Sequence, residues 1–117
     1  MQEIARQSLP GSHSEIRLQS IMPVMTPSAA NQRLLENFSR INQQLGGPAL
    51  SAVPIAERGG ADISYIANQV SAAIDGFGPW GSGAHSPQET LTVDSLSQAS
   101  ARVALFIARM IEDGAQP

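Results

Sequence analysis

The stretch GFGPWGSGAHSPQE (Gly76–Glu89) decides the expected fold, because it holds the only tryptophan and one of the two histidines of the chain. Four glycines and two prolines fall within its fourteen residues, and this content disfavours a regular helix or strand. Loops with such special backbone angles often carry binding or catalytic residues. We therefore expect an ordered, functional loop over residues 76–89.

Two short apolar runs before this loop have the length of strands, and the second, Ser71–Asp75, is short enough to be a buried one. Ser71–Asp75 lies directly before the loop and would place it at the C-terminal end of a strand. Leu50–Ile55 is interrupted by Pro54 and is expected to be strand-like. Between the two runs, apolar residues at helical spacing over 63–70 predict a helix with Asp62 as its cap.

Two longer amphipathic helices are expected on either side of this central region. The first should begin at Thr26-Pro27 and end near Leu45, before two glycines and a proline. The second should follow Asp94 or Thr92, either of which can cap it, and close at Gly114. Apolar residues at steps of three and four define the buried face of each helix. These residues are Leu34, Leu35, Phe38, Ile41 and Leu45 in the first helix, and Leu96, Ala99, Val103, Phe106, Ile107 and Met110 in the second.

Smaller elements are expected in the N-terminal residues. Glu3–Leu9 suits the last two turns of a helix, and the alternation over Ser14–Met22 predicts a half-buried strand. Pro23–Pro27 is expected to be an extended connector and is the best candidate for a boundary between two structural units. The resulting alternation of helices and strands predicts an α/β architecture, with helices packed on a largely parallel sheet.

The composition excludes several classes of function. The net charge is −3, and the seven basic residues are all arginines scattered singly, so we expect neither a nucleic-acid groove nor an anionic-membrane surface. The chain has no cysteine, which excludes disulfides, zinc–thiolate sites and thiol nucleophiles. No apolar run approaches the roughly 20 residues of a membrane-spanning helix, and no signal segment is recognised. We expect a soluble, cytoplasmic protein.

His85 is the first candidate for chemistry, with Glu89 and Asp75 close to it in the sequence. A neutral imidazole in a glycine-rich loop at the end of a strand suits a divalent metal. The alternative is a loop histidine that is hydrogen bonded to the backbone, and the spacing alone leaves both interpretations open.

The turn Arg58–Asp62 is the second candidate. Backbone amides at the start of the expected helix, together with the Arg58 guanidinium, suit an anion such as a carboxylate or phosphate. The turn is not a phosphate-binding P-loop, because it lacks that spacing and the chain has no lysine. The alternative is a surface turn with an aspartate cap.

The remaining aromatic and histidine residues have structural interpretations. His13 is expected to be solvated, and Tyr65 and Phe38 are expected in the core. Trp80 either lines a pocket or fills the base of the loop. No Gly-x-Ser-x-Gly sequence is present, so a serine hydrolase has no support.

Two spans taken together resemble a known family: RGGADISYIA (Arg58–Ala67), followed by DGFG (Asp75–Gly78) and GAHSPQE (Gly83–Glu89). They are similar to the C-terminal part of the zinc-dependent aminoacylase and carboxypeptidase family (metallopeptidase family M twenty). That family includes glutamate carboxypeptidases, acetylornithine deacetylases and succinyl-diaminopimelate desuccinylases. Its members open a helix with Gly-small-x-Asp and deliver a metal-binding histidine on a later Gly-x-Gly-x-His-x-x-x-Glu loop. The resemblance covers nearly the whole chain.

This resemblance implies a fold and a domain organisation. Residues 26–117 would form the C-terminal part of a phosphorylase/hydrolase-like three-layer αβα zinc exopeptidase domain. Residues 1–25 would be the last helix and strand of an α+β lid (dimerisation) domain, with Pro23–Pro27 as the crossing between the two.

The resemblance also implies roles for individual residues. His85 would be a zinc ligand. Gly81 and Gly83 would let the backbone approach the metal closely, and Glu89 would support the loop through hydrogen bonds. The substrate-carboxylate pocket would lie beside Arg58, Gly59, Gly60 and Asp62.

The sequence departs from the family in what it lacks. A two-zinc hydrolase needs several ligands, a bridging carboxylate and a general-base glutamate, and in the family these come from an N-terminal portion. We therefore expect no catalytic residue in this chain and no activity from it alone. The full enzyme would use zinc, with cobalt or manganese possible, to direct water at an amide or peptide bond beside a carboxylate-bearing group of a small peptide or N-acyl amino acid. The missing N-terminal half would be its partner, unless the chain self-associates; the alternative is a catalytically dead, truncated module for self-association or partner binding.

Overall fold

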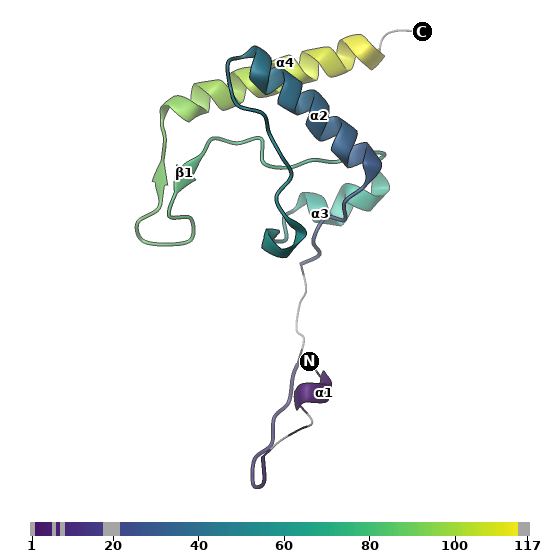
Figure 1. Cartoon of the computed structure of the whole chain (residues 1–117), viewed down its shortest axis with the longest axis vertical. Coiled ribbons are helices and arrows are strands. Elements are labelled where there is room, and N and C mark those ends of the chain that lie inside the picture. Colours follow the sequence, from purple (N-terminus) through teal and green to yellow (C-terminus); the bar gives the residue numbers. More distant parts are fainter. Residues whose placement is uncertain (1, 6, 8, 18–21, 115–117) are drawn as a thin grey trace.

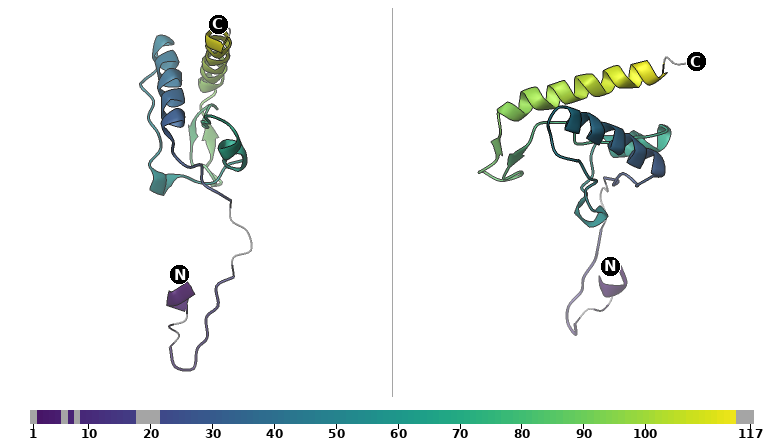
Figure 2. Two further views of the ribbon diagram at one scale, coloured as in Figure 1. Left: turned by 90° about the vertical axis from the view of Figure 1, so that its right-hand side faces the viewer. Right: turned by 45° about the horizontal axis from the view of Figure 1, so that its top comes forward.

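A computed structural model describes residues 2–5, 7, 9–17 and 22–114 of the chain. Two long helices, α2 and α4, lie against each other, and shorter elements are arranged along one side of them (Figures 1 and 2). The described elements are α1 (Gln2–Ala5), α2 (Ala29–Gln44), the 3-10 turn η1 (Ile55–Glu57), α3 (Ile63–Ile66), the 3-10 turn η2 (Ala67–Gln69), β1 (Gly81–Ser82), β2 (Thr90–Leu91) and α4 (Asp94–Gly114). None of the helices in this part of the chain has the length and apolarity needed to cross a bilayer.

Helix α2 begins at a serine cap and not at the expected Thr26-Pro27. Ser28 is extended, with φ −140° and ψ 159°, and its Oγ accepts a hydrogen bond from the Asn31 amide at 3.0 Å. An extended residue with a short side-chain acceptor satisfies one of the amides that a helix leaves free at its start. The start is therefore two residues later than Thr26-Pro27 indicated.

The end of α2 agrees with the sequence. Gly46 has φ +82°, and its amide donates to the Gln43 carbonyl at 3.0 Å. The Gly47 amide donates to the Asn42 carbonyl at 2.9 Å, which completes the paired hydrogen bonds of a Schellman motif. The two glycines therefore end the helix as expected.

Three phenylalanines form the centre of the core between α2 and α4. Phe38 of α2 lies 4.5 Å from Phe77 and 5.2 Å from Phe106 of α4, measured between ring centroids, and both pairs meet edge to face. Phe38, Ile41 and Phe106 are buried, which confirms the expected core positions in both helices. Aromatic pairs at these separations stabilise a core beyond the area they bury.

The expected apolar faces are only partly covered. Leu45 of α2 is 48% exposed, and Ile107 and Met110 of α4 are 53% and 47% exposed. Tyr65 is 54% exposed, so its expected place in the core is wrong. Helical spacing identified the side of each helix that packs, but not how far along the helix the partner extends.

The sheet differs most from the expectation. The strands among the described residues are β1 and β2, which pair antiparallel with Gly81 opposite Leu91 and Ser82 opposite Thr90. The described part of the chain is therefore mixed α/β, and it does not form the expected largely parallel sheet. The position of the loop at the end of a strand is likewise wrong, because irregular chain precedes it.

The two apolar runs expected as strands are irregular because side chains of α2 take their hydrogen bonds. In the first run, the Leu50 amide donates to Ser39 Oγ at 2.8 Å, and residues 55–57 turn into η1. In the second run, the Ala73 amide donates to Asn31 Oδ1 at 2.9 Å. These bonds satisfy part-buried amides without a neighbouring strand.

The expected helix over 63–70 is divided into α3 and η2. Asp62 has helical angles, φ −57° and ψ −36°, and its side chain makes no capping hydrogen bond. A residue already in the helical region cannot direct its side chain back to the following amides, so the expected aspartate cap is wrong. Ser64 Oγ instead accepts from the Ala61 amide at 3.3 Å.

The N-terminal residues form less regular structure than expected and lie away from α2 and α4 in Figure 1. Helix α1 ends at Ala5, earlier than the helix expected over Glu3–Leu9, of which Arg6 and Ser8 lie outside the described residues. Residues 14–17 and Met22 are not in a strand, and residues 18–21 of the expected strand also lie outside the description. Glu15 accepts two hydrogen bonds from the Arg17 guanidinium at 2.9 Å and thereby raises the pKa of Arg17.

Candidate functional site

His85 lies in the connection between β1 and β2, here called the His85 hairpin (residues 81–91). Its backbone has φ +64°, a left-handed conformation that non-glycine residues adopt only rarely. The next residue holds the turn, because the Ser86 amide and its Oγ both donate to the Gly83 carbonyl, at 3.1 and 2.7 Å. The side chain of His85 is exposed and makes no hydrogen bond within the described residues.

Gly81 and Gly83 are required by the close approach of the two sides of the hairpin. A Cβ added at Gly81 would overlap the carbonyl oxygen of Thr90 on the opposite strand. At Gly83, which has φ +69°, an added Cβ would lie 2.8 Å from the Gln88 carbonyl oxygen. The structure therefore gives both glycines a role in closing the hairpin.

The acidic residues near His85 in the sequence do not form a cluster with it. The Glu89 amide donates to the Ser86 carbonyl at 3.1 Å, while its exposed carboxylate has no partner within the described chain. Asp75 Oδ1 accepts from the Gly76 amide at 2.7 Å. No group of three histidine, cysteine, aspartate or glutamate side chains that could hold a metal ion is found in the described residues.

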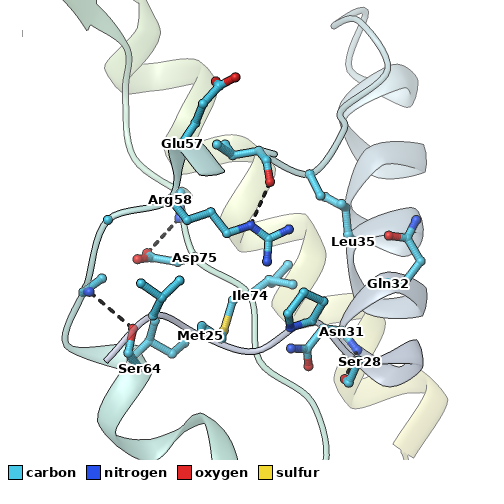
Figure 3. Close-up of a pocket in the computed structure, with 18 of the residues that line it drawn as sticks. Met25, Ser28, Asn31, Gln32, Leu35, Glu57, Arg58, Ser64, Ile74 and Asp75 are labelled. Atoms are coloured by element: carbon cyan, nitrogen blue, oxygen red, sulfur yellow. Dashed lines mark hydrogen bonds between the residues drawn. The ribbon is translucent and has the colours of Figure 1, made fainter. Parts of the chain in front are cut away.

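A pocket of about 380 Å³ lies beside the second candidate, Arg58, between its turn and the first half of α2 (Figure 3). The Arg58 side chain extends from the turn toward α2, and its Nε donates to the Val53 carbonyl at 2.7 Å. The Arg58 side chain makes no other hydrogen bond or ion pair within the described part of the chain. The terminal nitrogens of the guanidinium are therefore available to a ligand.

The lining of this Arg58 pocket is largely apolar. Figure 3 shows the Glu57 side chain directed away from the Arg58 guanidinium. Apolar walls with a small number of placed polar groups are typical of small-molecule sites, and here the polar groups include the Glu57 and Asp75 carboxylates as well as Arg58. The lining residues are Val24, Met25, Pro27, Ser28, Asn31, Gln32, Leu35, Ser51, Ala52, Val53, Glu57, Arg58, Gly59, Ala61, Ile63, Ser64, Ile74, Asp75 and Gly76.

The other residues of the expected anion-binding turn are less directly involved. Gly59 lines the pocket, but Gly60 packs against Met22, where an added Cβ would overlap that side chain. Asp62 is exposed and is not part of the pocket lining. Helix α3 has four residues, so its dipole adds little. The positive charge at this turn comes from Arg58.

The structure keeps the two candidate regions apart. The His85 hairpin extends from the beginning of α4, while the Arg58 turn lies below α2, and irregular chain over residues 70–80 joins the two (Figures 1 and 2). Neither His85 nor any other residue of the hairpin lines the Arg58 pocket.

Two buried polar residues of α4 near the hairpin are absent from the sequence-based candidates. Ser95 has no exposed surface, and its Oγ accepts from the Trp80 amide at 3.1 Å. Arg102 is 7% exposed and contacts the carbonyls of Phe77 and Gly78. A serine and an arginine on an amphipathic helix normally lie on its solvent-exposed face, so the sequence gave no indication that either residue is buried.

Comparison with known proteins assigns the chain to a class of hydrolase. The sequence model of the peptidase family M20/M25/M40 matches residues 10–109, which include the Arg58 turn and the His85 hairpin. The chain belongs to this family, whose members are hydrolytic metallopeptidases. No solved structure matches the chain.

The described residues do not by themselves fit the metal that this family uses. Zinc takes at least three protein ligands in catalytic sites and four in structural ones. His85 offers one exposed imidazole, and the nearby carboxylates of Asp75 and Glu89 do not join it in a cluster. The described part of the chain thus fits one ligand of a metal site and not a complete one.

Proposed function

We propose that this chain is the C-terminal segment of the catalytic domain of a metal-dependent hydrolase that cleaves an amide or peptide bond next to a carboxylate-bearing group. The family match over residues 10–109 carries this proposal, because it spans both candidate regions. Within it, residues 26–117 belong to a three-layer αβα catalytic domain and residues 1–25 to the end of a lid domain. The full enzyme is cytoplasmic.

His85 supplies one ligand to a pair of zinc ions in the full enzyme, with cobalt or manganese as alternatives. Its imidazole is exposed and free of hydrogen bonds within the described chain, so both ring nitrogens are open to other groups. Gly81, Gly83 and Glu89 hold the hairpin that presents it, the first two through close backbone approach and the third through its amide.

Arg58 binds the carboxylate of a small peptide or N-acyl amino acid. Its Nε is held by the Val53 carbonyl, which fixes the guanidinium while its terminal nitrogens remain available. A planar guanidinium suits a carboxylate because two parallel N–H groups match its two oxygens. Gly59 and Gly60 leave the turn without side chains at this position, and Asp62 follows it at the start of α3.

The remaining metal ligands and the general base come from residues outside this sequence. The described residues hold no group of three side chains that could bind a metal ion. In the full enzyme this chain supplies His85 and no catalytic residue. The N-terminal portion of the catalytic domain is therefore its partner.

Reconstitution tests this function. An enzyme of the same family is shortened by its C-terminal segment and mixed with this chain and zinc, and hydrolysis of an N-acyl amino acid is measured. We expect restored turnover that falls at least a hundredfold with His85→Ala but not with His13→Ala, since His13 is an exposed histidine of the described chain outside both candidate regions. Equal turnover in the two variants would refute the assignment of His85.

A second function is favoured by the exposed apolar residues of α4. Ile107, Met110 and Ile111 are 53%, 47% and 66% exposed on this helix, and such surface often marks an interaction site. The alternative is therefore a catalytically inactive module that self-associates or binds a partner. A chain that forms dimers in analytical ultracentrifugation and restores no turnover would favour this alternative.

A further inference from the structure

Arg102 is a buried cation in the core between α2 and α4. It is 7% exposed, and its guanidinium carbon lies 5.4 Å from the centroid of the Phe38 ring. Its Nη1 donates to Asn42 Oδ1 at 3.0 Å, and Asn42 Nδ2 in turn donates to the Pro48 carbonyl at 2.6 Å. Arginine is almost never buried to this extent unless its charge is paired.

The charge of Arg102 is not paired with a carboxylate within the described chain. The ion pairs there are Arg17–Glu15 and Arg109–Glu112. Arg102 Nε is buried and has no hydrogen-bond partner in the same residues. A buried cation with an unsatisfied donor costs free energy. A gain in global stability therefore does not explain the burial of Arg102, and we infer that its contacts have a local role.

The remaining contacts of Arg102 fall on the chain that leads into the His85 hairpin. Its Nη2 lies 3.5 Å from the Phe77 carbonyl oxygen and 3.4 Å from that of Gly78. Because both acceptors are backbone oxygens, these contacts with Arg102 constrain the path of the main chain. The Phe77 ring itself packs 4.5 Å from Phe38, which places this short segment against the same core.

Ser95 holds the other end of this segment from the same face of α4. Its Oγ accepts from the Trp80 amide at 3.1 Å and donates to the Thr92 carbonyl at 2.5 Å. The Thr92 amide donates to the Trp80 carbonyl at 3.0 Å. Ser95 and Arg102 are seven residues apart, which places them on one face of the helix about two turns apart.

We propose that Arg102 is a positioning residue for the His85 hairpin. It binds the main chain three to four residues before β1, and Ser95 fixes Trp80 directly before β1, so the hairpin leaves the core at a defined angle. Through Asn42 and Phe38, the same guanidinium joins this position to α2. The consequence for a metal ligand at His85 depends on the proposed function, but the positioning of the hairpin does not.

If Arg102 positions the hairpin, its removal should change the order of residues 81–91 without changing the free energy of unfolding of the protein. Arg102→Met removes a buried charge whose Nε has no hydrogen-bond partner, and this gain offsets the loss of the hydrogen bond to Asn42 Oδ1. Arg102→Met retains volume in the core and removes the contacts with Phe77 and Gly78. It therefore loosens the hairpin without unfolding the protein.

Nuclear magnetic resonance of the whole chain, without metal or substrate, tests this proposal. We expect the backbone order parameters of residues 81–91 in Arg102→Met to fall from about 0.85 to below about 0.6, while those of α2 and α4 stay at the rigid value. The urea midpoint of Arg102→Met is expected to remain near that of the unmodified chain. Arg102→Lys keeps the positive charge but lacks the planar set of donors of a guanidinium. We expect its backbone order parameters for residues 81–91 to lie between those of the unmodified chain and those of Arg102→Met.

Two control variants separate positioning from core packing and from charge. Ile41→Val removes one methylene from the core and lowers stability, yet we expect it to leave the hairpin ordered. Arg109→Met removes an exposed arginine from the same helix and should change neither quantity.

Three outcomes would overturn the proposal. They are an ordered hairpin in Arg102→Met, a hairpin that loosens equally in Ile41→Val, and global unfolding of Arg102→Met, which would assign Arg102 to the core as a whole. None of these results depends on reconstituted activity, so failure here and failure of the His85 assignment remain distinguishable.

Discussion

The His85 hairpin and the Arg58 pocket are supported by different helices. The hairpin is attached to α4 through the buried side chains of Ser95 and Arg102. The chain on either side of the Arg58 turn is attached to α2, through Ser39 at Leu50 and Asn31 at Ala73. We therefore expect that each candidate region can be disturbed by itself. Within the described residues, the two regions meet at the aromatic core between α2 and α4 and at the Arg102–Asn42 hydrogen bond.

The largest effect is expected at this shared core. Phe38→Ala removes a ring that contacts both Phe77 and Phe106, and it should lower the free energy of unfolding by about 3–5 kcal/mol. Amide exchange should increase in the hairpin and around the pocket together. Urea denaturation with hydrogen exchange measures both quantities.

The matched control for this variant is Leu45→Ala, on the same helix but 48% exposed. A loss of stability as large for Leu45→Ala as for Phe38→Ala would show that the aromatic cluster is not the shared core.

The second effect should be confined to the α2 side. Asn31→Ala leaves the amide of the buried Ala73 without its acceptor, and an unsatisfied buried donor costs about 1–3 kcal/mol. We expect faster exchange of the Ala73 amide and unchanged exchange in the His85 hairpin. Gln32→Ala removes an exposed hydrogen bond from the next residue and serves as the control. Faster exchange in the hairpin would argue against separate supports.

A third, smaller effect should be confined to the α4 side. Gly81→Val places side-chain atoms against the Thr90 carbonyl and should separate β1 from β2, at a cost of about 1 kcal/mol because both strands are exposed. Amide exchange of residues 82 and 90 reports the loss. Gly78→Ala is the control, because an added Cβ there meets open space. Protection retained in Gly81→Val would contradict the observed pairing.

The smallest effect on stability is expected from a change at Arg58, which should nevertheless abolish binding of a carboxylate ligand. Arg58→Gln is expected to change the free energy of unfolding by less than about 0.5 kcal/mol, because its side chain is partly exposed and makes one hydrogen bond. Titration with N-acetylglutamate, followed by the resonances of residues 57–61, should show binding to the unmodified chain and none to the variant. Arg33→Gln, an exposed arginine on α2, should bind as the unmodified chain does.

The sequence predicted the helices better than the segments between them. Phe38 and Phe106 lie at helical spacing among aliphatic residues, and this periodicity alone identified the packed faces of α2 and α4. Leu50 and Ala73 lie in apolar runs as short as strands, but their amides bond to Ser39 and Asn31, and no local pattern encodes such a long-range partner. The pattern therefore predicted the burial of Ala73 correctly, but Val53 and Ile55 of the first run are 53% and 65% exposed, and neither run pairs as a strand in the described structure.

The candidate site shows the same division. The glycine-rich loop and the glycine-containing turn singled out His85 and Arg58, and the family resemblance implied their roles. The family match includes both residues. The resemblance gave no information on Arg102 or Ser95, whose importance comes from where α4 meets the preceding chain. Those contacts join residues 15 to 25 positions apart, and they exist only once the helix has packed.

The left-handed backbone of His85 has a consequence for protein engineering. At φ +64° a histidine is disfavoured relative to glycine by roughly 1 kcal/mol, because its Cβ crowds the neighbouring carbonyl. A library screened for thermal stability alone would therefore tend to enrich glycine at position 85. Such a screen would relieve the backbone strain and at the same time remove the imidazole that we propose as a metal ligand, so selection for heat tolerance would act against that proposed role at this position.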